Sequence, residues 1–534
     1  MTDTARALSS SRTLWELLDR RAALSSERPV LLQGDRVLTF GGLRERAERV
    51  AAGLYGMGVR PGTVVAWQLP TRLETAVLSF ALARLGAVQS PVIPFYRDRE
   101  VGFALRESKA EYFAVPGVWR GFDHGEMARR LGAKGVFEAY DDLPEGDPGV
   151  LPAPPSDGTS VRWIYWTSGT TSDPKGVLHT DRSLIAGGSC LAHALRLTGD
   201  DVGSMAFPYA HIAGPDYTVM LLLYGFPAVM FEQFAMPDAL AEYRRHGVTV
   251  AGGSTAFYSM FLTEQRRQPG TPVVPSLRLL AGGGAPKPPE LYHSVVREMG
   301  VQLTHGYGMT EVPMITMGSP DDTAENLATT EGRPPEGMEI RVAPDGEVRL
   351  RGEAVCRGYL DPAQTAEAFD EEGFLRTGDL GRVTASGHLV LTGRLKDVII
   401  RKGENVSAKE IEDLLHAHPA VGDVAVIGLP DAERGERVCA VIELAAGAGA
   451  GAGVGEGGAG AGAGSGAGAG AGAGALTLDA VTAYLRAEGL SPHKLPEQLE
   501  VVDALPRNET LRKVLKYKLR ERYSTVGGGV TPGP

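Results

Sequence analysis

The chain has 534 residues, too many for one hydrophobic core, so at least two domains are expected. Hydrophobic residues make up 43% and charged residues 22% of it, and a net charge of −11 with interspersed signs argues against a nucleic-acid-binding surface. We find no run of 18 apolar residues, no signal-peptide core and no metal-ligand spacing among the three cysteines. We therefore expect a cytoplasmic protein without a transmembrane segment.

Helical and strand patterns alternate through roughly the first 390 residues, which predicts layered α/β structure with parallel strands. Thr13, followed by Glu16, predicts the start of a helix. Residues 31–37 read as strand, turn and strand, and Thr39 starts a second helix with one apolar face. These predicted elements are expected to build the core, and they do not indicate a function.

The pattern changes after residue 393, where an amphipathic helix is predicted at residues 409–415 and short strands at residues 424–428 and 438–442. Nearly pure Gly/Ala alternation then fills residues 445–475. This composition has no large side chain to bury, so we expect a disordered insertion within a small domain. The tail at residues 527–534 is also expected to be disordered.

A loop rich in hydroxyl groups and glycine follows a predicted strand at residues 161–165 and ends at a lysine. Its candidate phosphate-binding residues are Thr167, Ser168, Gly169, Thr170, Thr171 and Lys175. Backbone N–H groups and hydroxyls in such a loop can donate to phosphate oxygens, with the lysine as a mobile cation. The spacing is not that of a Walker A loop.

This stretch resembles the phosphate loop of the adenylate-forming superfamily, which contains acyl-CoA synthetases, adenylation domains of peptide synthetases and luciferases. Ser172 stands where the family usually has glycine, a mild change unless the backbone there needs a positive φ. Further motifs follow in the family's order over nearly the whole chain. The resemblance implies an α/β fold with a large N-terminal layered domain (residues 1–394) and a small mobile α+β C-terminal domain (residues 397–524).

Two motifs of the large domain resemble the family's nucleotide site. In residues 306–311, Tyr307 would stack on adenine, Thr310 would contact the α-phosphate and Glu311 would hold Mg²⁺, a hard cation suited to a carboxylate. The segment that would pass close to adenine and to the acyl group contains Gly283, Gly284 and Ala285.

Three motifs resemble the family's domain junction and thiol-transfer loop. Asp379 would bind both ribose hydroxyls, since a carboxylate can accept two O–H bonds. Arg394 would also reach the ribose, and Lys396 matches the hinge of domain rotation. Gly403 would line the pantetheine tunnel.

Residues 506–516 resemble the family's C-terminal lysine motif, although this loop is one residue longer and Arg512 replaces the usual glycine. Lys513 is the expected adenylation lysine, and Lys516 is the alternative. Two solvated lysines on a helix would be the ordinary structural interpretation.

Residues 207–214 resemble the motif at the acyl pocket, where His211 would lie beside the substrate carboxylate. Ala213 stands where amino-acid activators usually have an aspartate, which argues against an amino-acid substrate, although nearby Asp216 leaves that question open. Residues 252–258 and 309–314 would line the rest of the pocket. An apolar medium-chain, alicyclic or aryl acid is the expected substrate.

Taken together, the resemblance implies a ligase that uses ATP and Mg²⁺ to form an acyl-adenylate and then passes the acyl group to coenzyme A. Lys513, His211, Thr310 and Glu311 would be its catalytic residues, with Glu311 as the metal ligand. A carrier-protein loader, a luciferase-type oxygenase and a non-catalytic nucleotide-binding relative remain as alternatives. A carrier-protein partner and a homodimer are also left open.

Overall fold

The computed structural model describes residues 2–167, 174–402, 404–431, 433–445, 476–508 and 513–524. The predicted Gly/Ala insertion and tail lie outside the described residues, apart from Ala445. The chain forms two compact units. The larger contains residues 1–377, 381–391 and 509–513, and the smaller contains residues 378–380, 392–508 and 514–534.

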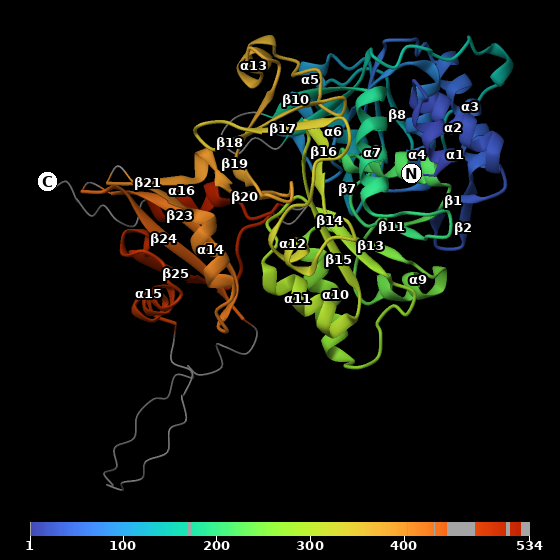
Figure 1. The fold of residues 1–534 in the computed structure, drawn as a ribbon. Helices are drawn as coiled ribbons and strands as arrows, with labels where there is room; N and C mark the ends of the chain where they lie inside the picture. Colours follow the sequence, from blue (N-terminus) through green and yellow to red (C-terminus); the bar gives the residue numbers. More distant parts are fainter. Residues whose placement is uncertain are drawn as a thin grey trace, which may run out of the picture. The chain divides into compact units, whose positions relative to one another are not determined.

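Two sheets form the first part of the larger unit (Figure 1). One has the order β11 (Gly203–Met205), β12 (Ala228–Met230), β1 (Pro29–Gln33) and β2 (Arg36–Thr39). The other has the order β10 (Lys175–Thr180), β9 (Val161–Thr167), β4 (Val88–Pro91), β3 (Val64–Trp67), β5 (Tyr112–Val115) and β8 (Val136–Glu138). Its strands are parallel except for the antiparallel pair β9–β10.

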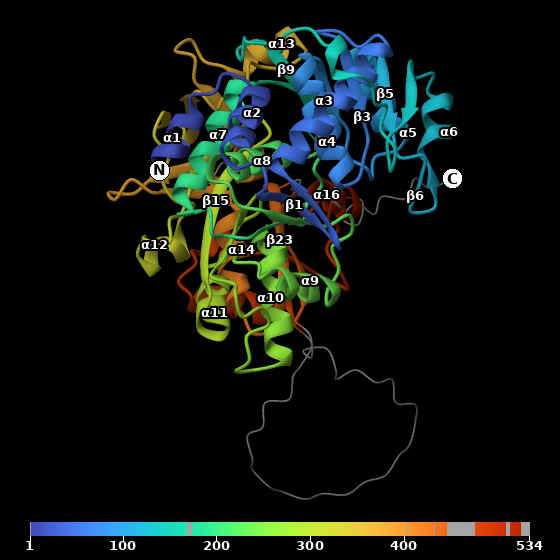
Figure 2. The same ribbon diagram turned by 90° about the vertical axis from the view of Figure 1, so that its right-hand side faces the viewer.

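A third sheet has the order β13 (Val250–Gly253), β14 (Leu279–Gly283), β15 (Gln302–Met309) and β16 (Val312–Met317). Its first three strands are parallel, and β15 and β16 form an antiparallel hairpin. Helices α10 (Thr255–Arg267) and α11 (Pro289–Met299) pack beside this sheet, as Figures 1 and 2 show. Because carboxyl ends of parallel strands share one edge, the segments after β13 and β14 lie beside the hairpin.

The remaining helices of the larger unit pack on these sheets and on one another. They are α1 (Asp3–Ser9), α2 (Leu14–Ser25), α3 (Phe40–Gly56), α4 (Leu73–Leu85), α5 (Asp98–Ser108), α6 (His124–Arg130), α7 (Asp181–Ala194), α8 (Ala213–Tyr224), α9 (Asp238–His246), α12 (Ala324–Thr329) and α13 (Pro362–Ala368). Every residue of α4 is buried, as expected for a helix with apolar residues on all sides and few polar ones. Each fully buried leucine or valine in this core contributes about 1.5–3 kcal/mol.

The predicted helix starts are confirmed. The Thr13 hydroxyl accepts a hydrogen bond from the Glu16 N–H at 3.1 Å and caps α2. The Thr39 hydroxyl accepts from the Gly42 N–H at 3.0 Å and caps α3. A threonine oxygen at this position satisfies one of the N–H groups that the first helical turn leaves unpaired.

The expectation of parallel layers up to residue 390 is wrong for the strands at residues 338–352. They belong to a sheet with the order β17 (Met338–Val342), β18 (Glu347–Gly352), β19 (Leu375–Val383) and β20 (Leu389–Arg394). β17 and β18 pair antiparallel, because the four residues between them cannot make the long crossover that parallel strands need.

The smaller unit contains a five-stranded sheet covered by helices. Its strands are β22 (Glu404–Ser407), β21 (Val398–Arg401), β24 (Gly435–Leu444) and β23 (Val421–Asp431), with β25 (Gln498–Val502) parallel to β24. Its helices are α14 (Ala408–His416), α15 (Leu478–Ala487) and α16 (Lys516–Ser524). The predicted helix and both predicted strands of this region are present, and the strands are longer than expected. The α/β fold with a large and a small domain is therefore confirmed.

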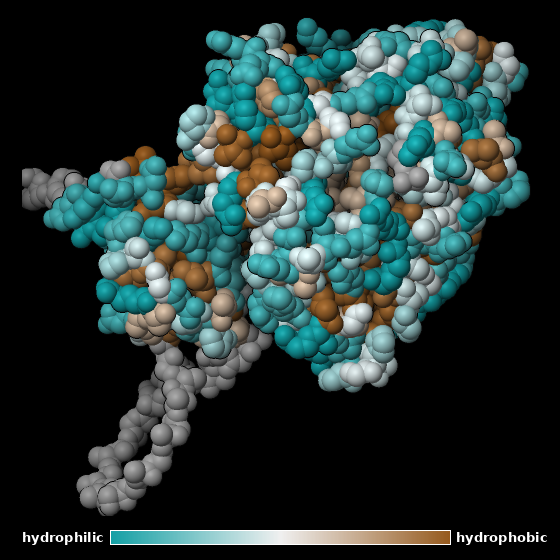
Figure 3. Space-filling view, viewed as in Figure 1, coloured by the Kyte–Doolittle hydropathy of each residue, from teal (hydrophilic) through white to brown (hydrophobic). Residues whose placement is uncertain are grey.

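The face shown in Figure 3 is mainly hydrophilic, and its most apolar residues gather in a few groups. Apolar residues normally contribute part of the surface of a folded protein. Among the residues that the structure describes, no helix is both long and apolar enough to cross a membrane.

Candidate functional site

The two ends of the predicted phosphate loop are held by the β9–β10 hairpin. Thr167 and Lys175 are partners in the strand register, and the Lys175 N–H donates to the Thr167 hydroxyl at 3.3 Å. The hairpin therefore fixes where the loop leaves and re-enters the sheet. The predicted residues Ser168, Gly169, Thr170 and Thr171, together with Ser172, lie outside the described residues.

Glycines allow β14 and β15 to approach closely at the predicted adenine segment. A Cβ atom on Gly283 would lie 2.5 Å from the carbonyl oxygen of Gly306, its partner in β15. Gly284 has φ +84°, a conformation that favours glycine. The Ala285 carbonyl oxygen lies 2.9 Å from Nε2 of His305. This segment is thereby fixed at the edge of the third sheet, next to the strand that carries Tyr307.

Glu311 lies at the tip of the β15–β16 hairpin, next to Thr310, and only 6% of it is exposed. Its Oε1 atom accepts a hydrogen bond from the Tyr359 hydroxyl at 2.8 Å. Its carbonyl oxygen accepts from the Cys356 N–H at 2.8 Å. Both the main chain and the carboxylate of Glu311 are therefore held by the segment at residues 356–359.

Tyr359 is a site residue that the sequence motifs did not indicate. Its segment pairs with β10: Val177 and Tyr359 form an antiparallel bridge, and the Leu360 N–H donates to the Gly176 carbonyl at 2.8 Å. The Lys175 ammonium lies 5.0 Å from the centroid of the Tyr359 ring. Burial and the charge of Glu311 raise the pKa of Tyr359, so its hydroxyl stays protonated and donates. Tyr359 thus connects the phosphate-loop lysine to the predicted metal ligand.

The surroundings of Glu311 fit a magnesium ion that travels with a nucleotide. Within the described ranges, no group of three or more His, Cys, Asp or Glu side chains could hold a metal. Magnesium ordinarily takes one or two carboxylates and completes its octahedron with phosphate oxygens and water. One buried carboxylate at the hairpin tip is compatible with that coordination.

His179 helps to position the β15–β16 hairpin, and the sequence motifs did not indicate this residue either. It is fully buried, and its Nε2 lies 2.8 Å from the Thr310 carbonyl oxygen while Nδ1 lies 2.9 Å from the Ser183 hydroxyl. Since a carbonyl oxygen only accepts, Nε2 carries the proton. Desolvation lowers the pKa of His179 to about 4, so a neutral ring holds Thr310 in place.

His211, which is predicted to lie beside the acid carboxylate, comes just before α8. Its Nδ1 accepts a hydrogen bond from the Ala213 N–H at 3.2 Å, so a neutral ring carries its proton on Nε2. Some of the residue is accessible, but the ring is desolvated, and this burial together with the charge of Lys513 lowers its pKa to about 4. His211 is therefore neutral at physiological pH, with Nε2–H available as a donor.

The two lysines of the C-terminal motif differ in environment. Lys513 belongs to the larger unit, where its charge acts on His211. Lys516 begins α16 in the smaller unit, and its ammonium lies 2.7 Å from Oε1 of Glu412. Glu412 also accepts a hydrogen bond from the Val426 N–H at 2.7 Å. Lys516 thus has a structural partner within its own unit.

The predicted ribose-binding residues of the smaller unit contact each other. Arg394 Nε lies 2.7 Å from Oδ1 of Asp379, which is buried, whereas the arginine side chain is about half exposed. Lys396 lies in the 3₁₀ turn Leu395–Asp397, and Asp397 pairs with Arg520 at 2.7 Å. Gly403 lies outside the described residues.

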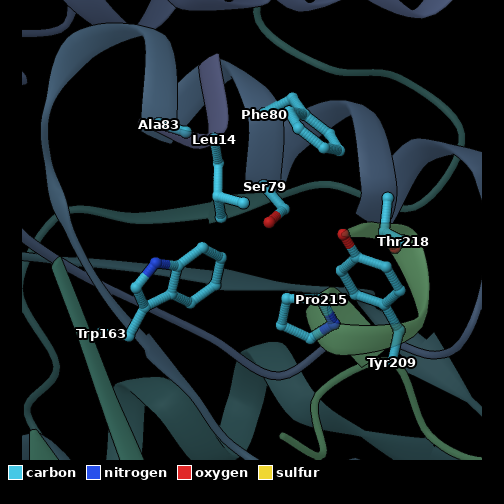
Figure 4. A pocket seen from close by; sticks show the side chains of 8 residues that line it. All are labelled: Leu14, Ser79, Phe80, Ala83, Trp163, Tyr209, Pro215 and Thr218. Atoms are coloured by element: carbon cyan, nitrogen blue, oxygen red, sulfur yellow. The ribbon is translucent and has the colours of Figure 1, made fainter. Parts of the chain in front are cut away.

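A small cavity lies beside α8 in the larger unit, and Figure 4 shows the side chains around it. It is lined by Leu14, Ser79, Phe80, Ala83, Trp163, Tyr209, Pro215 and Thr218. Thr218 donates to the Gly214 carbonyl at 2.9 Å, and the Tyr209 hydroxyl points toward the side where Thr218 lies. Its lining is mostly apolar, and none of the predicted site residues lines it.

Comparison with protein families gives two matches that cover most of the chain. The model of the AMP-binding enzyme family matches residues 18–360, and that of the AMP-binding enzyme C-terminal domain matches residues 410–511. The first match lies within the larger unit, and the second lies mostly within the smaller unit.

The chain is also similar to characterised proteins along most of its length. It is 31% identical to a salicyl-AMP ligase / salicyl-S-ArCP synthetase of Mycobacterium tuberculosis, over 98% of this chain and 93% of that protein. It is 29% identical to a medium-chain fatty-acid–CoA ligase of Escherichia coli, over 90% of this chain and 85% of that protein. Among solved structures, an o-succinylbenzoate coenzyme A synthetase of Bacillus subtilis in complex with ATP and magnesium ion is 27% identical. Its TM-score is 0.79, and the match covers 94% of this chain and 98% of that one.

Proposed function

The chain belongs to the AMP-binding enzyme family of adenylate-forming acid ligases, and we propose that it activates a carboxylic acid with ATP and transfers the acyl group to coenzyme A. The acid oxygen attacks the α-phosphorus, the bond to the β-phosphate breaks, and pyrophosphate leaves. The thiol then attacks the acyl carbonyl and AMP departs. The relatives named as CoA ligases and the solved complex with ATP and magnesium support these co-substrates.

The observation that carries the proposal is the neutral His211 in the field of Lys513. A carboxylate and a triphosphate are both anionic, so their approach needs donors and positive charge at the reacting oxygens. His211 Nε2–H can donate to the acid carboxylate, and Lys513 supplies a cation for the same region. Fixing both reactants in line supplies a further share of the rate.

Each motif would hold one part of the nucleotide. Lys175 and the phosphate loop would bind the phosphates, and Thr310 would contact the α-phosphate. Glu311, oriented by Tyr359, would hold Mg²⁺, which would neutralise phosphate charge. Tyr307 and the segment from Gly283 to Ala285 would bind adenine, and Asp379 with Arg394 would bind the ribose.

An acid with a largely apolar body is the proposed substrate. Phe257 and Met314, which belong to the segments expected to line the pocket, are both at least nine-tenths buried. Burial of an aryl, alicyclic or medium-chain body against such side chains would provide most of its affinity. The relatives named for salicyl-AMP and for medium-chain fatty acids support both kinds of acid.

Transfer to a carrier-protein thiol is the second proposal, favoured by the relative named salicyl-S-ArCP synthetase. Both proposals share the adenylation step and differ only in the acceptor. Thioester formation with free coenzyme A, measured against transfer to a pantetheinylated carrier protein, separates them.

Lys513→Ala tests the proposal most directly. We expect acyl-AMP formation, measured as pyrophosphate release, to fall by about 10²–10³-fold, the typical effect of removing one preorganised charge-stabilising group. Thioester formation from synthetic acyl-AMP and coenzyme A should change only a few-fold, because Lys513 is needed only in the first transition state.

Lys516→Ala is the matched control, because its ammonium is already paired with Glu412. We expect both half-reactions to remain within a few-fold of the original enzyme and stability to decrease slightly. Loss of adenylation in Lys516→Ala alone would move the catalytic role to that residue. Unchanged adenylation in both variants would favour a non-catalytic nucleotide-binding protein.

A further inference from the structure

Thr71 is a buried threonine in the loop between β3 and α4. Only 4% of the residue is exposed, and it comes directly before Arg72, the N-cap residue of α4. Its hydroxyl donates a hydrogen bond to the Phe207 carbonyl oxygen at 3.1 Å and accepts one from the Tyr209 N–H at 2.9 Å. One side chain therefore satisfies two main-chain groups of a segment that lies far away in sequence.

The segment that Thr71 binds leads to His211. It links β11 to α8, and His211 follows Tyr209 by two positions. The His211 N–H donates to the Pro208 carbonyl oxygen at 2.9 Å, and the Gly214 N–H donates to the His211 carbonyl oxygen at 2.8 Å. The turn that holds His211 thus starts at Pro208, between the two residues that Thr71 holds.

Close packing makes this segment dependent on its internal hydrogen bonds. A Cβ atom on Gly214 would lie 2.1 Å from the Tyr209 carbonyl oxygen. Only 1% of Tyr209 is exposed, and its ring centroid lies 6.1 Å from that of Trp67 in β3. Because the segment is buried, a main-chain group that lost its partner there would stay unpaired at a cost in stability.

The loop that carries Thr71 is itself held on both sides. The Thr75 hydroxyl donates to the Pro70 carbonyl oxygen at 2.6 Å. The Leu73 N–H donates to Oε1 of Gln33 in β1 at 3.2 Å. A group that orients a reactive side chain must itself be fixed by packing and hydrogen bonds, and Thr71 meets this requirement.

We propose that Thr71 is a positioning residue for adenylation: its hydroxyl fixes the turn that presents His211, and thereby the direction of the His211 Nε2–H group. This inference rests on the proposed function, in which that group donates to the substrate carboxylate. Thr71 acts through His211 and need not touch a reactant. Misplacement of a reacting group by about 1 Å can lower a rate about 10²-fold, so such an indirect role can have a large effect.

Thr71→Val tests the proposal, because it removes the hydroxyl and keeps the shape of the side chain. The Phe207 carbonyl and the Tyr209 N–H lose this partner. We expect kcat/KM for the acid, measured as pyrophosphate release, to fall by about tenfold to a hundredfold. KM for ATP should stay within a few-fold of its original value. Thr71→Ser keeps the hydroxyl and should restore kcat/KM to within a few-fold.

A double-mutant cycle with His211→Ala separates positioning from a general loss of packing. If Thr71 acts through His211, Thr71→Val should change kcat/KM only a few-fold when it is introduced into His211→Ala. A threonine with a structural role alone would cause the same relative loss in both proteins. Thr71→Ala removes the same hydroxyl with a smaller side chain and should show the same dependence on His211, so it replaces a Thr71→Val protein that does not fold.

The titration of His211 gives a second measurement, which needs no turnover. Burial and the charge of Lys513 lower the pKa of His211 to about 4. A loosened turn should admit water to the ring, so this pKa should rise toward its usual value in Thr71→Val and stay low in Thr71→Ser. NMR of protein with isotope-labelled histidine measures it, and the His211 signal is identified by its absence from His211→Ala.

Thr249→Val is the matched control. The Thr249 hydroxyl also links two segments, since it accepts from the Val202 N–H at 3.0 Å and donates to Oδ1 of Asp201 at 2.7 Å. Thr249 and Val202 come directly before β13 and β11, whereas Phe207 follows β11. We expect Thr249→Val to lower the free energy of unfolding and to leave both kcat/KM and the His211 titration unchanged.

Equal relative losses from Thr71→Val with and without His211, or an unchanged kcat/KM in Thr71→Val, would overturn the inference. If no acid gives pyrophosphate release in the original protein, the proposed function fails, and the titration alone decides on Thr71. The titration also decides if His211→Ala is too slow to measure. A raised pKa of His211 in Thr71→Val then supports the positioning role, and an unchanged pKa refutes it.

Discussion

Tyr359 shows how a single hydroxyl can connect two parts of the proposed nucleotide site. It donates to Glu311 at 2.8 Å, and its ring lies 5.0 Å from the Lys175 ammonium. A hydrogen bond to a carboxylate of this kind contributes about 1.5–3 kcal/mol and fixes the direction of its lone pairs. If Glu311 is the proposed metal ligand, its carboxylate is held in one orientation before a metal ion binds.

Tyr359→Phe should weaken adenylation about tenfold at low magnesium, because Glu311 would lose the bond that orients it. Pyrophosphate release measured over a range of magnesium concentrations should show a higher half-saturating concentration and recovery at excess magnesium. Tyr243→Phe is the control, since its hydroxyl donates to Ser204 at 2.8 Å and should affect stability alone. An unchanged magnesium dependence in Tyr359→Phe would show that the Tyr359 hydroxyl does not orient Glu311 for magnesium binding.

At the scale of elements, local signals predicted where helices begin but not which distant segments meet. Thr13 and Thr39 cap their helices because a cap depends on a few neighbouring residues. The sequence did not indicate Tyr359 as a site residue. Its place in the site depends on an antiparallel bridge to Val177, which is far away in sequence. Asp216 was noticed only as a neighbour of His211, since burial without a partner is not visible in a sequence.

The 3₁₀ turn Leu395–Asp397 is the element expected to act as the hinge. It lies between β20 and β21, and Asp397 is anchored to Arg520 of α16. A change of backbone angles at Lys396 would therefore carry α16 and its sheet together. The hinge assignment itself stays a prediction.

Lys396→Pro should separate the two half-reactions. Proline fixes φ near −65° and restricts the residue before it, so the second arrangement of the small domain should become inaccessible. We expect pyrophosphate release to stay within a few-fold while thioester formation from acyl-AMP and coenzyme A drops sharply. Lys396→Ala, which keeps the backbone free, should preserve both. Equal losses in both assays for Lys396→Pro would make Lys396 an ordinary structural residue.

For the whole molecule, the buried carboxyl group of Asp216 in α8 affects stability. Natural domains are stable by only about 5–15 kcal/mol, so one buried group with a strongly shifted pKa is a large fraction of that margin. Burial raises the pKa of Asp216 from 3.8 to about 8. The folded protein therefore keeps a proton on this group over a pH range in which the unfolded chain has released it.

The sign of the pH dependence follows from this shift. The contribution of Asp216 to stability is fully present below pH 4, where both states are protonated, and is lost progressively as the pH rises from about 4 to about 8. Asp216→Asn has no proton to lose, so its free energy of unfolding should exceed that of the original protein increasingly toward pH 8. Urea unfolding of both proteins at pH 5, 6.5 and 8, without substrate, measures the difference. A difference that is constant with pH would mean that the Asp216 carboxyl group is solvated in the folded state.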